Sequence, residues 1–380
     1  ADAAERGRGN AVAPAPETIG NRSPQRQPKA ASAAAADALK SGGSRERLCA
    51  SELPAPAPGE TPVRLHKAWP SRNKFYCSGS LMMGGESEFP VVGGFNCSWA
   101  NCCAWSCILL PTLCFFVTVA PYLWSSFVVL PIIVVAALAS TVSFLFLACC
   151  SDPGVIPRRE VILATACQEQ LTELLGYNPL GVGTPAHDKG LDRERMVPPE
   201  LRQRGYNWCH TCEIIRPPRA SHCPECDNCV MRFDHHCPFV NNCVGQRNYH
   251  FFIGFLTSVC CLAVVVLPSF AWSMFRERQG LQVSIGAGGE DVVKYALIAV
   301  GIAVGIAALC LCNLWMYHLW LILKGKTTKE HLKGRRVENF DQEPTFCAPR
   351  GPQLFDQYAW VHRSQVTRPP RPAAAVARHG

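Results

Sequence analysis

Apolar residues along this 380-residue chain gather into four long blocks separated by polar sequence. The blocks cover residues 104–124, 127–149, 249–275 and 293–323. Each is close to the ~20 apolar residues that cross the hydrocarbon core of a bilayer, and none shows the polar stripe of a surface helix. The pattern predicts an α-helical integral membrane protein with four transmembrane helices. A pair of buried helical hairpins in a soluble core is the disfavoured alternative.

The four blocks also define the expected domains. Residues 1–72 are rich in Ala, Pro, Ser and Arg and lack the apolar core of a signal peptide, so we expect a disordered cytosolic N-terminus. The other expected regions are a pre-membrane segment with helices one and two (73–149), a loop (150–248) with a cysteine-rich domain at about 205–248, helices three and four (249–323) and a tail (324–380).

Charge predicts the orientation of the helices. The connection 276–291 holds two arginines and three acids. Lys and Arg instead flank the central loop and follow the fourth block, as Arg158, Arg159, Arg232, Arg247, Lys324, Lys326, Lys329, Lys333, Arg335 and Arg336. Positive residues beside spans mark the cytosolic side, so the central loop and both termini should be cytosolic. Orientation and attraction to anionic lipids then explain the net charge of +8, and no nucleic-acid partner is expected.

Cysteine and histidine are concentrated in residues 209–243. A disulfide framework is excluded for a domain in the reducing cytosol, and the Cys-x-x-Cys spacings are typical of zinc sites. The region holds ten candidate ligands: Cys209, Cys212, His222, Cys223, Cys226, Cys229, His235, His236, Cys237 and Cys243. Two closed zinc sites need eight of these, so two remain for chemistry. We recognise no internal repeat beyond two interleaved zinc patterns.

The tetrapeptide from Asp234 to Cys237 suggests which residues remain. In an extended strand, His235 and Cys237 face one side while His236 faces the other, toward a metal. Asp234 could fix the tautomer of His235, and a thiol beside an oriented imidazole becomes a thiolate nucleophile. The candidate catalytic residues are therefore Cys237, His235 and Asp234, although spacing alone does not prove that Cys237 is the free cysteine.

The position of Cys237 suggests a substrate. It precedes the third block, which begins at Tyr249, by twelve residues, so its thiol should lie at the cytosolic membrane face. A thiol at that depth can meet a lipid chain among the helices and a soluble thioester headgroup outside, which points to long-chain acyl-CoA. Nearby arginines could meet the CoA phosphates or could be ordinary positive-inside charge: Arg216, Arg219, Arg232 and Arg247.

The run from Cys209 to Phe252 resembles the cysteine-rich domain of DHHC-type protein S-acyltransferases (palmitoyltransferases). The resemblance rests on Asp234-His-His-Cys237, Asn242-Cys243-Val-Gly245 and Asn248, with further motifs at Asp152-Pro-Gly154, Thr327-Thr-Lys-Glu330 and Asn339. The order of spans and motifs matches from about residue 74 to 345. Phe239 stands where most members of the family have Trp, and the residues after Asn339 lack the small side chains usual in that motif.

The resemblance implies two structural Zn²⁺ ions and a ping-pong mechanism. It assigns Cys209, Cys212, His222 and Cys229 to one zinc, and Cys223, Cys226, His236 and Cys243 to the other. Palmitoyl-CoA would be the co-substrate, Cys237 would carry the acyl group, and cysteines of client proteins near the membrane would receive it. Residues 73–77 resemble a subgroup placed in the Golgi and related endomembranes, with ER or plasma membrane as alternatives, and some of that subgroup require an accessory subunit.

Two rival functions fit part of the pattern. A membrane-anchored zinc module such as a RING-type ubiquitin ligase would spend all its ligands on metal and leave no Asp-His-x-Cys remainder. A catalytically silent acyltransferase relative would serve as a scaffold, but Asp234, His235 and Cys237 are all present. The enzyme is therefore the favoured interpretation.

Overall fold

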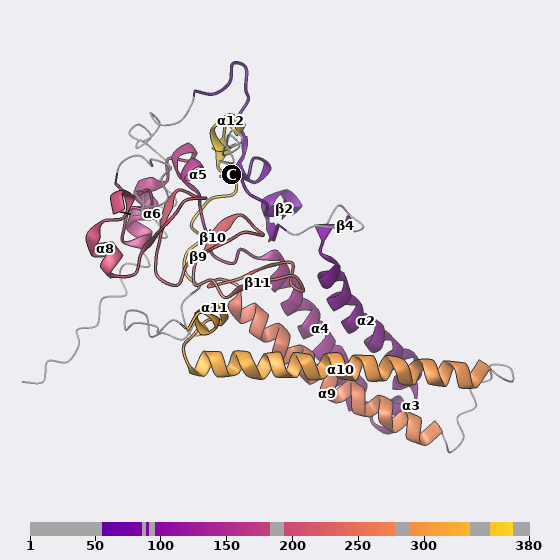
Figure 1. Ribbon diagram of the computed structural model, residues 1–380. Coiled ribbons are helices and arrows are strands. Elements are labelled where there is room, and N and C mark those ends of the chain that lie inside the picture. The colour runs from indigo at the N-terminus through magenta and orange to yellow at the C-terminus, as the bar shows by residue number, and fades with distance from the viewer. Residues whose placement is uncertain are drawn as a thin grey trace, which may run out of the picture. The chain divides into compact units, whose positions relative to one another are not determined.

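The computed structural model describes residues 55–85, 89–90, 96–182, 194–277, 289–334 and 350–367. Within these ranges, four helices are long and apolar enough to cross a membrane, which confirms the predicted fold class. They are α2 (Trp99–Thr118), α4 (Val129–Cys150), α9 (Tyr249–Glu277) and α10 (Gly289–Leu323), labelled in Figure 1. Helix α9 packs against both α4 and α10.

The first membrane helix begins before residue 104 and is interrupted before residue 124. The Ser98 hydroxyl accepts a hydrogen bond from the Asn101 amide (3.2 Å) and caps the start of α2. Helix α2 ends at Thr118, and α3 (Ala120–Ser126) follows with Pro121 in its first turn. Proline suits a first turn because its missing N–H would have no helical partner there. Hydropathy could not locate this break, since the sequence is apolar on both sides of it.

The segment between α4 and α9 forms short antiparallel strands and short helices. Its strands are β6 (Val155–Ile156), β7 (Asn207–Cys209), β8 (Ile214–Arg216), β9 (Ser221–Cys223), β10 (Asn228–Val230), β11 (His235–Cys237) and β12 (Asn242–Val244). One sheet has the order β6-β10-β9, while β7 pairs with β8 and β11 with β12. The helices are α5 (Arg159–Ala164), α6 (Gln168–Leu175) and α8 (Pro199–Gln203). Strands of two or three residues bury little apolar surface, so this domain needs another source of stability.

Both flanking segments contain more structure than the sequence suggested. Strand β1 (Val63–Arg64) and the 3₁₀ turn η2 (Leu65–Lys67) lie inside the N-terminal stretch expected to be disordered through residue 72. In the tail, β13 (Trp360–Val361) pairs with β1, and α12 (Arg363–Val366) follows. Leu65, Phe355 and Val361 share one buried cluster. The disorder prediction was therefore wrong for the residues around β1, because their partner comes from the other end of the chain. Residues 1–54 lie outside the described ranges.

The pre-membrane segment has further small elements. They are β2 (Lys74–Tyr76), η3 (Cys77–Gly79), β3 (Leu81–Met83), β4 (Phe89–Pro90) and β5 (Asn96–Cys97), with β2 paired to β3 and β4 to β5. The Gly84 amide donates to the carbonyl of Asn241 (2.8 Å), and a Cβ at Gly84 would lie 2.7 Å from that oxygen. Glycine is needed here because the two backbones approach so closely. This contact holds the pre-membrane segment to the turn that follows β11.

Candidate active site and metal centres

Three hairpins of the central domain share one plan that recurs every 14 residues. In each, a cysteine ends the first strand and pairs in register with the residue that begins the second: Cys209 with Ile214, Cys223 with Asn228, and Cys237 with Asn242. Each turn closes with a residue of positive φ just before the second strand: Glu213 (51°), Asp227 (54°) and Asn241 (52°). The three turns are therefore copies of one another in backbone shape, a repeat that the sequence analysis missed.

Two groups of metal-ligand side chains form between successive hairpins. Each group combines the two cysteines of one turn with a His–Cys pair that faces across the strands of the next hairpin. The first group is Cys209, Cys212, His222 and Cys229, and the second is Cys223, Cys226, His236 and Cys243. The ligand atoms within each group lie within 4.8 Å of one another. The eight residues that the family resemblance implied are thus brought together as two sets of four.

The chemistry of both groups fits zinc. His222 Nδ1 lies 3.4 Å from the sulfur of Cys212, and His236 Nδ1 lies 3.4 Å from that of Cys226. Three thiolates and one imidazole, all turned inward, match the donor set and tetrahedral number of a closed structural zinc site. With four protein ligands each, neither group leaves a position for a substrate.

The first metal group has an acidic partner on its histidine. Asp227 Oδ1 lies 3.5 Å from His222 Nε2, and Asp227 Oδ2 accepts a hydrogen bond from Arg158 (2.9 Å). A carboxylate on the outer nitrogen of a ligating histidine fixes its tautomer and strengthens it as a ligand. The buried Arg158 also donates to the carbonyls of Pro70 and Thr211, and so ties this group to the residues just before the pre-membrane segment.

The third hairpin has the same turn, but its turn cysteine, Cys237, belongs to none of the groups of possible metal ligands among the described residues; the nearby Asp234 and His235 form a third such group with His318. Cys237 occupies the place of Cys209 and Cys223, yet the second cysteine of the turn is replaced by Val240. Its cross-strand pair, His236 and Cys243, already belongs to the second metal group. The alternation predicted for residues 235–237 is observed, because His236 lies in that group while His235 and Cys237 lie outside it.

Asp234, His235 and Cys237 form a hydrogen-bonded series. His235 Nδ1 donates to Asp234 Oδ2 (2.7 Å), and a hydrogen bond also joins His235 to Cys237. The backbone amide of Thr328 donates to the other oxygen of Asp234 (2.9 Å). Asp234 is 1% exposed and Cys237 is 8% exposed, whereas the His235 side chain is 27% exposed, so the acid and the thiol are buried and the imidazole between them is partly open to solvent. This is the arrangement of a thiol, a base and an orienting acid.

Burial and pairing set the charge states of this series. Burial by itself disfavours the imidazolium, but the hydrogen bonds and negative charge of Asp234 and Cys237 outweigh it and raise the pKa of His235 to about 10. For Asp234, burial is likewise outweighed by the His235 hydrogen bond and nearby positive charge, and its pKa is lowered. The environment therefore favours the carboxylate of Asp234 and the protonated ring of His235, the form that stabilises a thiolate.

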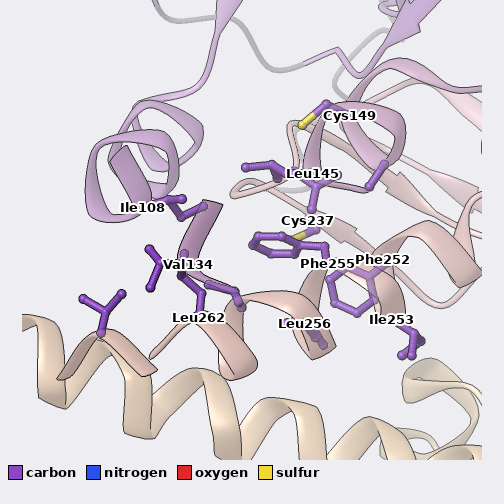
Figure 2. Packing of buried hydrophobic residues seen from close by; sticks show 14 of the residues in the cluster. Ile108, Val134, Leu145, Cys149, Cys237, Phe252, Ile253, Phe255, Leu256 and Leu262 are labelled. Carbon is purple, nitrogen blue, oxygen red and sulfur yellow. The ribbon is translucent and has the colours of Figure 1, made fainter. Parts of the chain in front are cut away.

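An apolar cavity of about 350 Å³ opens beside the Cys237 thiol. Its walls come from α2, α9, α10 and the Cys237–Val240 turn, and include Ile108, Phe252, Phe255 and Leu311. Figure 2 shows Cys237 within this cluster, with Phe252 and Phe255 of α9 and Ile108 of α2. Phe239, the residue that departs from the usual Trp, also lines the cavity and is 56% exposed. The thiol thus faces a space suited to a hydrocarbon chain.

Two of the motifs noted in the sequence lie outside the hairpins and brace the site. Asp152 Oδ1 accepts the amides of Gly154 and Val155 (both 2.8 Å), and its Oδ2 lies 3.1 Å from Arg247 Nε. Burial raises the pKa of Asp152, opposed by these amides and by Arg247. This turn leads from the end of α4 into β6, where Gly154 adopts a φ of 104° that favours glycine. Asp152 therefore joins the second span to the cysteine-rich domain.

The fourth span is joined to the same domain by α11 (Thr328–Leu332). Thr327 and Glu330 form a reciprocal capping box at its start. Glu330 also accepts two hydrogen bonds from Arg219 (2.8 and 3.1 Å), and Arg219 donates to the carbonyl of Gly325. Residues 327–330 thus link the fourth span to the cysteine-rich domain, and the link ends on Asp234 through the Thr328 amide.

The arginines considered for CoA phosphates are largely engaged within the protein. Arg219 pairs with Glu330 and Arg247 with Asp152. Arg232 is buried, and Arg216 donates to the carbonyl of Trp208 (3.5 Å). These contacts favour a structural role for Arg219 and Arg247. Asn339 lies outside the described residues.

Comparisons with known proteins agree with this geometry. A family model described as DHHC palmitoyltransferase matches residues 202–335, which include all three hairpins, α9, α10 and α11. The palmitoyltransferase ZDHHC18 of Rattus norvegicus is 31% identical over 337 residues, covering 82% of this chain and 79% of that protein. ZDHHC14 of Homo sapiens is 30% identical over 339 residues (83% and 64%), and the palmitoyltransferase erf2 of Aspergillus fumigatus is 35% identical over 250 residues (63% and 38%).

Proposed function

This chain belongs to the DHHC palmitoyltransferase family, and we propose that it moves a palmitoyl or similar long acyl group from acyl-CoA to client cysteines through an S-acyl intermediate on Cys237. One observation carries the proposal. The Cys237 thiol is hydrogen-bonded to His235, which is oriented by Asp234, and it lines an apolar cavity of about 350 Å³. A nucleophile and a place for a hydrocarbon chain therefore meet at one sulfur atom.

The first half-reaction loads the enzyme. The proton of Cys237 lies on His235 before the reaction begins, and Asp234 stabilises this imidazolium beside the Cys237 thiolate. The thiolate attacks the carbonyl of the acyl-CoA thioester, a C–S bond to Cys237 forms, and the bond to the CoA sulfur breaks. The CoA thiolate leaves with the proton that His235 returns. The acyl chain lies in the apolar cavity, so the carbonyl is held at the sulfur by the position of the chain.

The second half-reaction unloads the enzyme. A client thiol gives its proton to His235 and attacks the acyl carbon, and the thioester to Cys237 breaks as the Cys237 thiolate leaves and is reprotonated. One thioester is exchanged for another in each half, so the mechanism is ping-pong and needs no oxidant or nucleotide. Clients should present cysteines close to the membrane, because the acyl carbon stays near the ends of the spans.

Two zinc ions are proposed as structural. Cys209, Cys212, His222 and Cys229 would hold one, and Cys223, Cys226, His236 and Cys243 the other. Their chemistry is to neutralise buried thiolates and cross-link hairpins too short to fold on apolar contacts alone. The second ion would brace the site, since its ligand His236 lies between His235 and Cys237 on β11 and its ligand Cys243 lies on the paired strand β12.

We also propose that the cysteine-rich domain and both termini face the cytosol of a Golgi or ER membrane, with the plasma membrane as an alternative. The Lys and Arg bias beside the spans supports this orientation. A tag at Gly183 and one at the C-terminus should be cleaved by protease added to sealed membranes from the cytosolic side, while a tag at Gly286 should be protected. Protection of the Gly183 tag would separate the thiol from cytosolic acyl-CoA and contradict the proposal.

The direct test is self-acylation. The purified protein, with or without an accessory subunit added, is incubated with labelled palmitoyl-CoA, and we expect label on the protein that neutral hydroxylamine removes. Label should then pass to a client peptide carrying a membrane-proximal cysteine when free palmitoyl-CoA has been removed. Absence of hydroxylamine-labile label would reject the enzyme, and failure of the chase alone would reject the ping-pong order.

A further inference from the structure

His318 is a polar residue buried in the part of α10 that can span a membrane. It is 1% exposed and lies between Gly301 and Leu323. An imidazole in an apolar setting is costly unless its nitrogens find partners, and ionisable groups at such positions commonly serve function. The family function proposed above assigns nothing to this residue.

The contacts of His318 connect it to the Asp234–His235 pair. Its Nδ1 lies 3.2 Å from the hydroxyl of Tyr249, which is also 1% exposed. One nitrogen of His318, one nitrogen of His235 and a carboxylate oxygen of Asp234 all lie within 4.8 Å of one another. The two imidazole rings have centroids 5.8 Å apart and are inclined by 37°. His318 therefore faces the pair from the membrane side.

Phe252 completes the enclosure and connects it to the cavity. Its ring stands edge-on to His235 (5.4 Å, 71°) and to His318 (5.0 Å, 77°), and it lines the apolar cavity. Tyr249 and Phe252 belong to α9, while His318 belongs to α10. The surroundings of the pair are thus assembled across the contact between two membrane helices, which also supply cavity walls.

We propose that His318, held by the Tyr249 hydroxyl, is a positioning residue that fixes the Asp234–His235 pair for acyl transfer at Cys237. The proposal rests on the function proposed above and adds a residue to it. The Thr328 amide and His235 already hold the two oxygens of Asp234. His318 closes the remaining approach and prevents the His235 ring from turning away from the thiol. The position of His318 depends on α9 and α10. The orientation of the Asp234–His235 pair therefore depends on how these helices pack around the acyl chain.

The test compares variants of the full-length protein in palmitoyl-CoA turnover, measured as CoA release. His318→Leu fills the space of the imidazole with an apolar side chain and removes its polar contacts. His318→Gln retains a hydrogen-bonding group. Tyr249→Phe removes only the hydroxyl. Trp315→Phe is the matched control, because it breaks another α9–α10 hydrogen bond, from Trp315 Nε1 to Thr257 (3.0 Å), without touching the pair.

We expect His318→Leu to lower kcat by about tenfold or more, since the loss of an oriented base typically costs about 10²–10⁴-fold and only its orientation is affected here. KM for palmitoyl-CoA should stay within about twofold, because the cavity wall is unchanged, and bound zinc should stay at two per chain. His318→Gln should recover much of kcat, and Tyr249→Phe should lower it in the same direction. A structural role alone would change Trp315→Phe equally and would lower the folded fraction.

Three outcomes would overturn the proposal. They are a kcat within twofold of the parent for His318→Leu, an equal loss in Trp315→Phe, and a loss that appears in KM alone. If His318→Leu does not fold, His318→Gln and Tyr249→Phe decide, and parental kcat in both would reject the role. Cys237→Ser distinguishes the two proposals, because hydroxylamine-labile label in that variant would reject Cys237 as the nucleophile whatever His318 does.

Discussion

The β9–β10 and β11–β12 hairpins have the same backbone shape, but the turn cysteines of the first belong to a metal group and the turn cysteine of the second does not. Both end their first strand on a cysteine, turn through a residue of positive φ and place a histidine opposite a cysteine across the strands. In β9–β10 the turn cysteines Cys223 and Cys226 join a metal group completed by the hairpin that follows. In β11–β12 the corresponding residues are Cys237 and Val240.

The difference between the two hairpins leaves one turn thiol outside both four-ligand metal groups. Each metal group needs a turn from one hairpin and a His–Cys pair from the next. The β11–β12 hairpin is followed by α9, so no further hairpin supplies such a pair to its turn. Val240 removes the second ligand as well. Cys237 therefore occupies a ligand's position on a strand pair that supplies two ligands to the second metal group, while its own thiol lies outside both groups of four.

Exchange of the equivalent cysteines tests the comparison most strongly. Cys237→Ser should reduce self-acylation to background while the protein keeps two zinc ions and its thermal midpoint, because its sulfur is outside both groups. Cys223→Ser should lose about one zinc per chain and unfold more easily, since structural zinc contributes about 10–16 kcal/mol of apparent binding free energy in small domains. Metal analysis, thermal melting and labelled palmitoyl-CoA measure this. Loss of zinc from Cys237→Ser would show that Cys237 is a ligand.

Variants of the adjacent residues His235 and His236 should likewise differ, one in acylation rate and the other in zinc content. His235→Ala should slow acylation by about 10²–10⁴-fold, because the base is lost, and should leave zinc at two per chain. His236→Ala should lower zinc content and destabilise the domain, since its ring belongs to the second metal group. Single-turnover labelling beside metal analysis compares the two variants. Equal zinc loss in both would refute the division of roles.

Restoring the missing turn cysteine should convert the third hairpin toward a metal site. In Val240→Cys, two thiols would share a turn of the same shape as the turn that holds Cys223 and Cys226. We expect added Zn²⁺ to inhibit its self-acylation several-fold, with recovery on addition of a mild chelator, because a Cys-x-x-Cys turn binds zinc through both thiolates. Val240→Ala is the matched control. Equal zinc sensitivity in the parent, Val240→Ala and Val240→Cys would show that Val240 does not keep metal away.

The smallest expected effect is on zinc release and concerns Asp227, the carboxylate that contacts His222 of the first metal group. Asp227→Asn weakens the orienting contact with His222 and the ion pair with Arg158. Removal of such an outer partner typically lowers metal affinity by about 10–100-fold. The isolated protein should still hold two zinc ions but release one sooner to a competing chelator, with self-acylation close to the parent. An unchanged rate of zinc release would show that Asp227 serves only to form the turn and does not support His222 as a ligand.

Local sequence was sufficient to predict the spans and the metal-ligand inventory. Four apolar blocks of bilayer length are visible without a structure, because lipid requires continuous apolar sequence. The alternation of His235, His236 and Cys237 also follows from local geometry, because side chains of a strand alternate between its faces. The break at Val119 and the ordered strand β1 were missed, since the first depends on backbone conformation within uniformly apolar sequence and the second on a partner near the other end of the chain.

By itself, then, the sequence determined that this protein is a four-span membrane protein with two sets of zinc ligands and a thiol beside an Asp-His pair. Residue spacing alone left the grouping of these ligands open, and the family resemblance implied it. The tertiary structure gives the physical reason, because each turn joins the His–Cys pair of the hairpin that follows it. It also brought Thr328, Tyr249 and His318 to the Asp234–His235 pair from positions at least 12 residues away in the chain. Such contacts carry no local pattern, since each side chain is chosen for a neighbour that is adjacent only after the helices and hairpins have packed.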